Sequence, residues 1–445
     1  MLVDPPRLTG GGPLGQLRFF AEHPLEIFLR ANALGGVVRM RLATKPAFIV
    51  SSPEAIRQVL VDKVADYQKK TRGYNKLRLL LGDGLVTSEG EFWLRQRRIA
   101  QPAFSKHRLA HFADAMIVAA QDQLTAWAGP AERREVVDVA EAMNRLALRI
   151  AGETLVGQDV TGAAAEIGRS LLQILERFPS LVSSPLPWPE HWPLPQNRPF
   201  WKGIRTIHRV VDEVIATRRR GEAGSDLLGL LMAARDPETG EAMTDRQLRD
   251  EVITMLLAGH ETTANALAWT LHLLATHPEI QDRVAAEAQA VLGAATVTAD
   301  DLPKLVWLRQ VFQESLRLYP PIWLIARRAE VADVLAGVPI PAGAYLFISP
   351  WAAHRRPEAW PEPERFLPER FDPSQPPPDR FTWLPFSRGR RQCIGDRFAE
   401  IEALIILAEL VRRFRFLPVP GRAPVPEPSV TLRPGGGLVL QVEVR

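Results

Sequence analysis

The sequence predicts a mainly α-helical protein with small β-sheet regions. Helical hydrophobic periodicity runs with few breaks from Glu89 to about Arg283, whereas the strand-like stretches elsewhere are short and bounded by glycine or proline. The 445 residues include 46% hydrophobic and 24% charged residues, a globular composition that excludes wholesale disorder. Long helices with few strands between them favour a large α-rich architecture.

The first 90 residues are expected to form a small sheet beside a short helix. The helix covers residues 23–33, and the strand-like runs are Val37–Leu42 and residues 47–51. Further helices are predicted over residues 92–100, 108–128, 137–156, 161–177, 201–220 and 247–275. Between them, seven prolines and two tryptophans in residues 178–200 exclude regular helix, which leaves a lid over an apolar site or a rigid surface loop.

The C-terminal third begins with a helical block over residues 280–319, which ends at Pro320-Pro321. Strand-like stretches follow at residues 323–326 and 345–349. The proline-rich run over residues 357–378 alternates with three aromatic residues, Trp360, Phe366 and Phe371, so we expect it to be packed rather than to act as a linker. A final helix over residues 398–414 precedes a strand-rich tail.

Charge and targeting signals exclude several classes of protein. The net charge of +4 is too small for a nucleic-acid binder of this length. The N-terminus lacks the basic and apolar regions of a secretory signal, so we expect a cytoplasmic protein. Residues 252–275 are long enough to cross a bilayer, but they contain His260, Glu261, Asn265 and His272. This segment is therefore predicted to be a buried central helix, not a transmembrane anchor.

The single cysteine, Cys393, excludes a disulfide framework and any multi-thiolate zinc or iron–sulfur site within this chain. Gly389 favours a sharp turn before it, Gly395 allows close approach, and a helix begins directly afterwards. Three arginines lie beside it: Arg388, Arg390 and Arg391. This setting favours an anionic ligand or nucleophile over a buried structural cysteine.

The segment Phe386-x-x-Gly389-x-Arg391-x-Cys393-x-Gly395 resembles the haem-binding signature of the cytochrome P450 family at every fixed position. The resemblance implies a cytochrome P450 fold over residues 1–445, a single haem domain with a β-rich part at about 35–85 plus 323–356. It also implies haem b, with Cys393 as the axial ligand of the iron. Phe386 would pack near the sulfur, and Arg391 would pair with a haem propionate.

Two further segments resemble the family's structural motifs. Glu314 and Arg317 are an i,i+3 pair that means little alone, but with Pro320-Pro321 after them they resemble the Glu-x-x-Arg motif. The segment Pro363-x-x-Phe366-x-Pro368-x-Arg370-Phe371 resembles the family's meander, in which Arg370 would complete a buried charge triad. His354 matches a structural stretch before it and is not expected to bind metal.

The predicted central helix contains Ala258-Gly259-His260-Glu261-Thr262-Thr263. Burying Glu261 is costly unless it has a function or a hydrogen-bonded environment, so a satisfied polar patch between helices is the alternative. The segment resembles the family's oxygen-activation motif, with O₂ as co-substrate. The resemblance implies that Gly259 opens the helix beside the bound O₂, that Thr262 hydrogen-bonds it and that Glu261 relays protons.

Trp93 and Arg97 lie one helical turn apart, as in many amphipathic helices. In the family both would donate to a haem propionate, joined by Arg327 or by its neighbour Arg328. By the same resemblance, the substrate pocket would be lined by Leu77, Leu80, Leu257, Ala258, Ile322, Leu324, Ile325, Gly437 and Leu438.

A pocket so apolar favours a fatty acid, terpenoid, carotenoid or steroid. Lys76 and Arg78 would bind a carboxylate at its entrance, which tilts the prediction slightly towards fatty acids; the alternative is that both are simply solvated. The predicted function is a haem-thiolate monooxygenase that hydroxylates or epoxidises such a substrate. The alternatives are a peroxide-driven peroxygenase, a haem-thiolate sensor and an arginine-rich helical binding protein without a cofactor.

No stretch of the sequence is left for a flavin or iron–sulfur domain. We therefore expect two electrons from a separate ferredoxin or flavodoxin and its NAD(P)H-dependent reductase. Four arginines are predicted to form a basic docking patch for this acidic partner, with solvated surface arginines as the alternative: Arg388, Arg390, Arg95 and Arg98.

Overall fold

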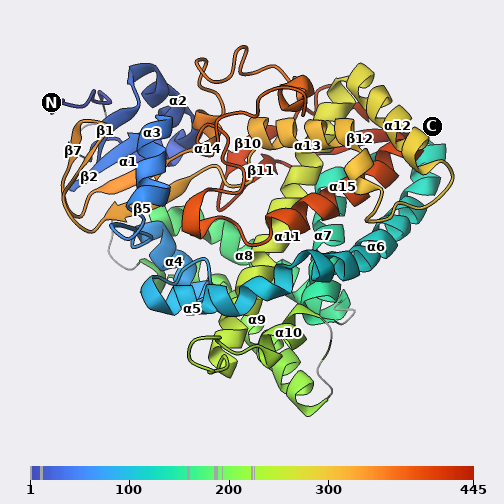
Figure 1. Cartoon of the computed structure of the whole chain (residues 1–445), viewed down its shortest axis with the longest axis horizontal. Coiled ribbons are helices and arrows are strands. Elements are labelled where there is room, and N and C mark those ends of the chain that lie inside the picture. The colour runs from blue at the N-terminus through green and yellow to red at the C-terminus, as the bar shows by residue number, and fades with distance from the viewer. Residues whose placement is uncertain are drawn as a thin grey trace.

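The computed structural model describes residues 3–10, 14–157, 161–184, 189–192, 194–221, 224 and 226–445. The predicted fold class, mainly α with small sheets, is confirmed (Figure 1). The helices are α1 (Leu17–Glu22), α2 (Pro24–Leu34), α3 (Pro53–Arg57), α4 (Arg72–Leu81), α5 (Gly90–Ala100), α6 (Lys106–Glu132), α7 (Val139–Val156), α8 (Thr161–Ser183), α9 (Asn197–Arg220), α10 (Leu227–Ala233), α11 (Asp245–Thr276), α12 (Pro278–Leu292), α13 (Val306–Leu318), α14 (Pro350–Ala353) and α15 (Asp396–Arg413).

The strands belong to several small sheets. They are β1 (Val37–Leu42), β2 (Lys45–Val50), β3 (Tyr67–Gln68), β4 (Val136–Asp138), β5 (Ile325–Ala329), β6 (Asp333–Leu335), β7 (Val338–Ile340), β8 (Tyr345–Ile348), β9 (Phe414–Pro418), β10 (Val425–Pro428), β11 (Leu432–Gly435) and β12 (Val439–Val444). Short helical turns, η1 to η6, cover Gln58–Asp62, Gln101–Phe104, Pro189–His191, Leu302–Lys304, Pro368–Phe371 and Gly389–Arg391.

The largest sheet joins strands from the first 70 residues to strands between residues 325 and 348. Its strand order is β1-β2-β8-β5-β3, and β2 runs parallel to β8, with Val50 opposite Ile348. The sheet lies with α1 and α2 on one side of the molecule, while the long helices fill the other (Figure 1). Helices α3 to α13 therefore lie in the sequence between these two paired strands.

Helix α11 runs through the centre of the helical part and is buried on nearly all of its faces (Figure 1). A Thr244–Gln247 capping box fixes its start, because each side chain bonds the other residue's backbone N–H. Its C-terminal half packs with α6, α7, α13 and α15 in the largest hydrophobic core. None of the helices within the described ranges combines the length and hydropathy needed to cross a membrane.

Part of the prediction for residues 178–200 is wrong. Helix α8 continues through Pro179 to Ser183, and α9 begins at Asn197, so both ends of this segment are helical. The buried side chains of Leu175 and Leu181 keep α8 on the core across the proline, and Pro199 lies in the first turn of α9, where its missing N–H costs little. Residues 185–188 and 193 lie outside the described residues.

Candidate haem and oxygen-activation site

The loop before α15 places Cys393. Its backbone N–H donates to Phe386 O at 3.0 Å, which closes the loop. Gly389 has φ +79°, and an added Cβ would lie 2.2 Å from Leu60 O, so both backbone conformation and close contact require glycine. At Gly395 an added Cβ would meet Phe104 at 3.8 Å, an ordinary contact, so no close approach between described residues explains this glycine.

The Cys393 side chain lies deep in the protein and yet is accessible, so its accessible surface faces an internal space. Burial raises the Cys393 pKa to about 11 and outweighs the lowering by Gly395 N–H and Arg97. In the protein without its cofactor, burial thus outweighs the neighbouring charges that were expected to favour a thiolate. A bound metal cation would have to supply the missing stabilisation.

Helix α11 also borders open space, along one stripe. Ala258, Gly259 and Thr262 are exposed or half-buried, whereas the helix around them is buried. A Cβ added at Gly259 would meet no atom of the described residues within 4 Å. The Thr262 hydroxyl donates to Ala258 O at 2.5 Å, and the alanine and threonine share a face because they lie one turn apart.

Glu261 and His260 are buried beside this stripe. Burial raises the Glu261 pKa, partly offset by the Thr431 hydroxyl and the charge of Arg433. Burial lowers the His260 pKa to about 4, so this ring stays neutral. The acid next to Thr262 therefore keeps its proton to higher pH than an exposed glutamate would.

Four cationic side chains gather near Cys393 around one carboxylate, that of Glu89. They are Lys69, Arg97, Arg327 and Arg391. Burial, Arg391 and Arg327 lower the Lys69 pKa well below its usual value, although its Nζ donates to Val86 O at 2.9 Å. The lysine was missed by the sequence analysis because no motif surrounds it.

Arg391 makes the most contacts that fix its side chain near Trp93 and Glu89. Its guanidinium stacks on the Trp93 ring at 3.9 Å, donates to Ser88 O at 2.6 Å and pairs with Glu89. Its Nη1 is buried without a hydrogen-bond partner among the described residues. Four cations facing one carboxylate, with a donor left over, suit a ligand with two carboxylates. The residues therefore fit haem and its two propionates.

The structure decides between the two candidate arginines on β5. Arg327 is 2% exposed and donates to Ala326 O at 2.9 Å. Its positive charge lowers the pKa of both Lys69 and Arg391. Arg328 pairs instead with Glu330, through contacts of 2.8 and 2.9 Å. Arg327 is therefore the cation that belongs to the cluster.

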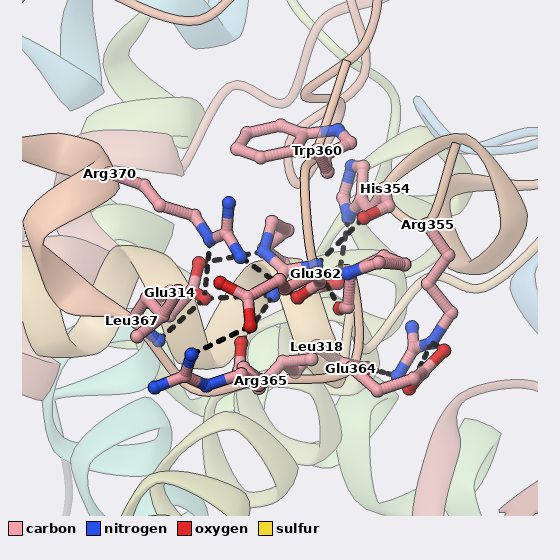
Figure 2. A network of polar contacts seen from close by, with 12 residues as sticks. Glu314, Leu318, His354, Arg355, Trp360, Glu362, Glu364, Arg365, Leu367 and Arg370 are labelled. Carbon is pink, nitrogen blue, oxygen red and sulfur yellow. Dashed lines mark hydrogen bonds and ion pairs between the residues drawn. The ribbon is translucent and has the colours of Figure 1, made fainter. Parts of the chain in front are cut away.

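Glu314 and Arg370 lie together (Figure 2), and Arg317 pairs with the same carboxylate. Arg317 binds Glu314 through two hydrogen bonds of 2.7 and 2.8 Å, with both side chains fully buried, and Arg370 Nε lies 3.3 Å from Glu314. The remaining Arg317 donors bind the carbonyls of His354, Pro363 and Arg365. The network ties α13 to the proline-rich segment, which is packed as expected.

The predicted pocket residues do not all reach the open space. Leu77 and Leu324 are half-buried and Ile322 is 37% exposed, whereas Leu80, Leu257 and Ile325 are buried. The placement of Gly437 and Leu438 is wrong: Leu438 O accepts from Val139 N, at the start of α7, and its side chain belongs to the core there. An added Cβ at Gly437 would likewise meet Asp138.

The tail approaches α11 earlier, at the turn between β10 and β11. Asn265 Nδ2 donates to Thr431 Oγ1 at 2.9 Å, and Leu432 N donates to Pro321 O at 2.8 Å. This turn thus touches both α11 and the segment after α13. The sequence carries no motif at Thr431 that would have indicated it.

The expected carboxylate site at the entrance is also wrong. Lys76 Nζ forms a buried ion pair with Glu190, with side-chain exposures of 8% and 3%. Arg78 lies 3.1 Å from Asp83 and donates to Thr87 O. Because both cations already have partners, neither is available for a fatty acid.

The basic patch is narrower than expected. Arg95 and Arg98 pair with a loop after α10, in which Asp236 is fully buried and accepts two hydrogen bonds from Arg98 at 3.0 and 3.1 Å. Arg388 donates to the carbonyls of Arg380 and Trp383 but remains partly exposed. Arg380 and Arg390 are exposed, so these two and Arg388 make up the patch.

Comparison with known proteins agrees with this site. A sequence model described as "Cytochrome P450" matches residues 4–441. Among curated relatives, "Cyclooctat-9-en-7-ol 5-monooxygenase" of Streptomyces melanosporofaciens is 38% identical over 94% of this chain and 91% of its own. "Cyclooctatin synthase" of the same organism is 35% identical over 96% and 93%, and "Pentalenene oxygenase" of Streptomyces avermitilis 33% over 88% and 87%. The chain belongs to the cytochrome P450 family and is a monooxygenase of that family.

Proposed function

We propose that residues 1–445 form one haem domain that hydroxylates or epoxidises an uncharged terpenoid, using O₂ and two electrons from separate redox proteins. Members of the family bind haem through a cysteine thiolate and use O₂. The observation that carries the proposal is the internal space faced by Cys393, beside four cations that surround one carboxylate.

The proximal residues would hold haem b. Cys393 would bind the iron, and Phe386, whose carbonyl holds the Cys393 backbone, would pack beside the sulfur. Lys69, Arg97, Arg327 and Arg391 would bind the propionates, with Trp93 supporting Arg391. When bound, the haem supplies the chemistry that inserts one oxygen atom into the substrate and reduces the other to water.

Glu261 and Thr262 would deliver the protons that the reaction consumes. Glu261 is buried with a raised pKa, and the adjacent Thr262 hydroxyl lies on the accessible stripe. An acid next to an alcohol can pass a proton from the protein interior to the open space. Gly259 would leave room for oxygen there, since no described atom occupies the position of its missing Cβ.

The substrate class follows from the chemistry around the expected pocket. Its side chains are apolar, and Lys76 and Arg78 are held by Glu190 and Asp83, so a carboxylate would lack a partner. A neutral polycyclic molecule gains from burial at roughly 25 cal/mol per Å² and needs no such partner. The relatives named for cyclooctatin and pentalenene support a terpenoid over a fatty acid.

The electron donor would be an acidic ferredoxin or flavodoxin. Arg380, Arg388 and Arg390 lie on or near the loop that ends in Cys393, so a negatively charged partner bound there would sit close to the iron ligand. Its NAD(P)H-dependent reductase would complete the chain of electron carriers.

The carbon monoxide difference spectrum of the reduced protein tests the cofactor. We expect a thiolate-type band that Cys393→Ser abolishes; its persistence in that variant would rule out Cys393 as the ligand. A titration series of terpenes, steroids and fatty acids, followed by the spin-state change, tests the substrate class. Binding of fatty acids alone would refute a terpenoid. Thr262→Ala should keep the haem but divert reducing equivalents to peroxide by roughly tenfold or more.

A further inference from the structure

The hairpin β10–β11 covers the face of α11 that carries the buried acid. Glu261, Asn265 and Trp269 follow one another at intervals of one turn and so share this face. Trp269 Nε1 donates to Leu432 O at 3.2 Å, and Asn265 donates to the Thr431 hydroxyl at 2.9 Å. Two hydrogen bonds thus fix the hairpin beside Glu261.

The Thr431 hydroxyl is oriented by its partner. Asn265 occupies an acceptor position of Oγ1, which leaves the hydroxyl hydrogen free to donate. Asn265 holds the hydroxyl one helical turn from Glu261, where it lowers the pKa of the Glu261 carboxyl, and Thr431 is only 3% exposed. Glu261 itself is 6% exposed, and its Oε2 has no hydrogen-bond partner in the part of the chain that the structure describes. The carboxyl is therefore held on one side and unsatisfied on the other.

The positive charge of Arg433, two residues after Thr431 on the hairpin, lowers the pKa of the same carboxyl. Its guanidinium pairs with Glu427, directly opposite across the hairpin, at 2.6 Å. These two side chains are 27% and 46% exposed, so the pair reaches solvent. Among the described residues, two neighbouring parts of the chain add no charge there: His260 is neutral because its pKa falls to about 4, and residues 320–326, which bond the hairpin turn, are apolar.

We propose that Thr431 and Arg433 are positioning residues for Glu261, and that the hairpin β10–β11 sets when this acid holds or releases its proton. The inference rests on the proposed role of Glu261 in proton delivery. The hydroxyl hydrogen and the nearby positive charge both stabilise the carboxylate. Without them, Glu261 would keep its proton to higher pH and release it less readily at neutral pH.

The experiment compares variants of the haem-loaded enzyme. Thr431→Val removes the hydroxyl but keeps the shape, and Thr431→Ser restores it. Arg433→Gln removes the charge, and Arg433→Lys restores it. Ser429→Ala is the matched control, because Ser429 lies in the same turn and its buried hydroxyl has no partner among the described residues.

Infrared pH titration of the ferric enzyme follows the carboxyl band of Glu261, identified by its loss in Glu261→Gln. The midpoint should move to higher pH in Thr431→Val and Arg433→Gln and stay in place in the other three variants. The pH optimum for product formed per NAD(P)H should move the same way. An unchanged midpoint in both Thr431→Val and Arg433→Gln, or an equal shift in Ser429→Ala, would overturn the proposal.

Failure of the broader function has a separate signature. If the unaltered protein lacked a thiolate-type carbon monoxide spectrum or oxygenated no terpenoid, the proposed function would fall, while the infrared midpoint would still report on Thr431 and Arg433.

Discussion

His354 Nε2 accepts a hydrogen bond of 2.7 Å from the backbone N–H of Leu384, just before the loop that ends in Cys393. Because Nε2 accepts, the ring carries its hydrogen on Nδ1, which donates to Arg317 O at 3.1 Å. The neutral imidazole thus links the cysteine loop to α13. This agrees with the structural role expected for His354.

This link makes the fold sensitive to acid. Burial lowers the His354 pKa from 6.5 to about 3, so the unfolded chain binds the proton first. The stabilisation is complete above pH 6.5 and is lost as the pH falls from there towards 3, by up to about 1.4 kcal/mol per pH unit. Urea unfolding of the wild type and His354→Gln between pH 7 and 4 should show their difference shrinking on acidification. A difference that stays constant between pH 7 and 4 would contradict this.

Because of the charge network at Glu314, we expect a single substitution of this residue to cause a large loss of stability (Figure 2). Glu314→Gln leaves Arg317 buried and Arg370 without the carboxylate that both contact. Removal of one partner from a buried pair typically costs about 3–5 kcal/mol. Thermal unfolding should reveal this loss, together with weaker haem retention.

Glu362→Gln is the control for that measurement. Glu362 pairs with Arg365 on the same proline-rich segment, but both side chains are more than half exposed. Such a surface pair contributes about 0–1 kcal/mol. Equal losses of stability in the two variants would contradict the prediction, because the buried triad would then contribute no more than a surface ion pair.

Local sequence predicted what lies within one turn or loop. Within the Cys393 loop, which has a positive φ at Gly389, and within the Glu314–Arg317 pair, the interacting residues are only a few positions apart. The spacing within each motif therefore carries the signal. Lys69, Thr431 and the Lys76–Glu190 pair depend on contacts between distant segments. No periodicity or propensity encodes those contacts. The sequence analysis therefore missed Lys69 and Thr431 and assigned Lys76 to the wrong partner.

Substitution of Lys69 tests the cation cluster, because we expect it to stabilise the haem-free protein and to weaken haem binding. Lys69→Met removes one of four crowded cations, so it should stabilise the haem-free protein against thermal unfolding. It also removes a donor to a propionate, worth roughly 1.5–3 kcal/mol, or about 10- to 100-fold in haem affinity. Haem transfer to apomyoglobin measures the second effect.

Lys70→Met is the matched control for the cluster, because Lys70 is adjacent but pairs with Glu330 at the surface. It should change neither haem transfer nor the stability of the haem-free protein by a comparable amount. If Lys69→Met lowered the stability of the haem-free protein and left haem affinity unchanged, Lys69 would be a structural residue only.

The narrowed basic patch predicts which arginines control reduction by an acidic partner. Arg390→Glu should slow association with a ferredoxin or flavodoxin at low ionic strength, because Arg390 is exposed and has no ion pair among the described residues. Arg98→Glu should act mainly on stability, since Arg98 is already bound to Asp236. Arg220→Glu, which gives the same change in net charge at the end of α9, is the control. Stopped-flow measurement of the reduction rate at low and high salt separates the cases. The slower reduction of Arg390→Glu should disappear at high salt, because salt screens the charges. If Arg390→Glu and Arg220→Glu were slowed equally, the partner would not dock on this loop.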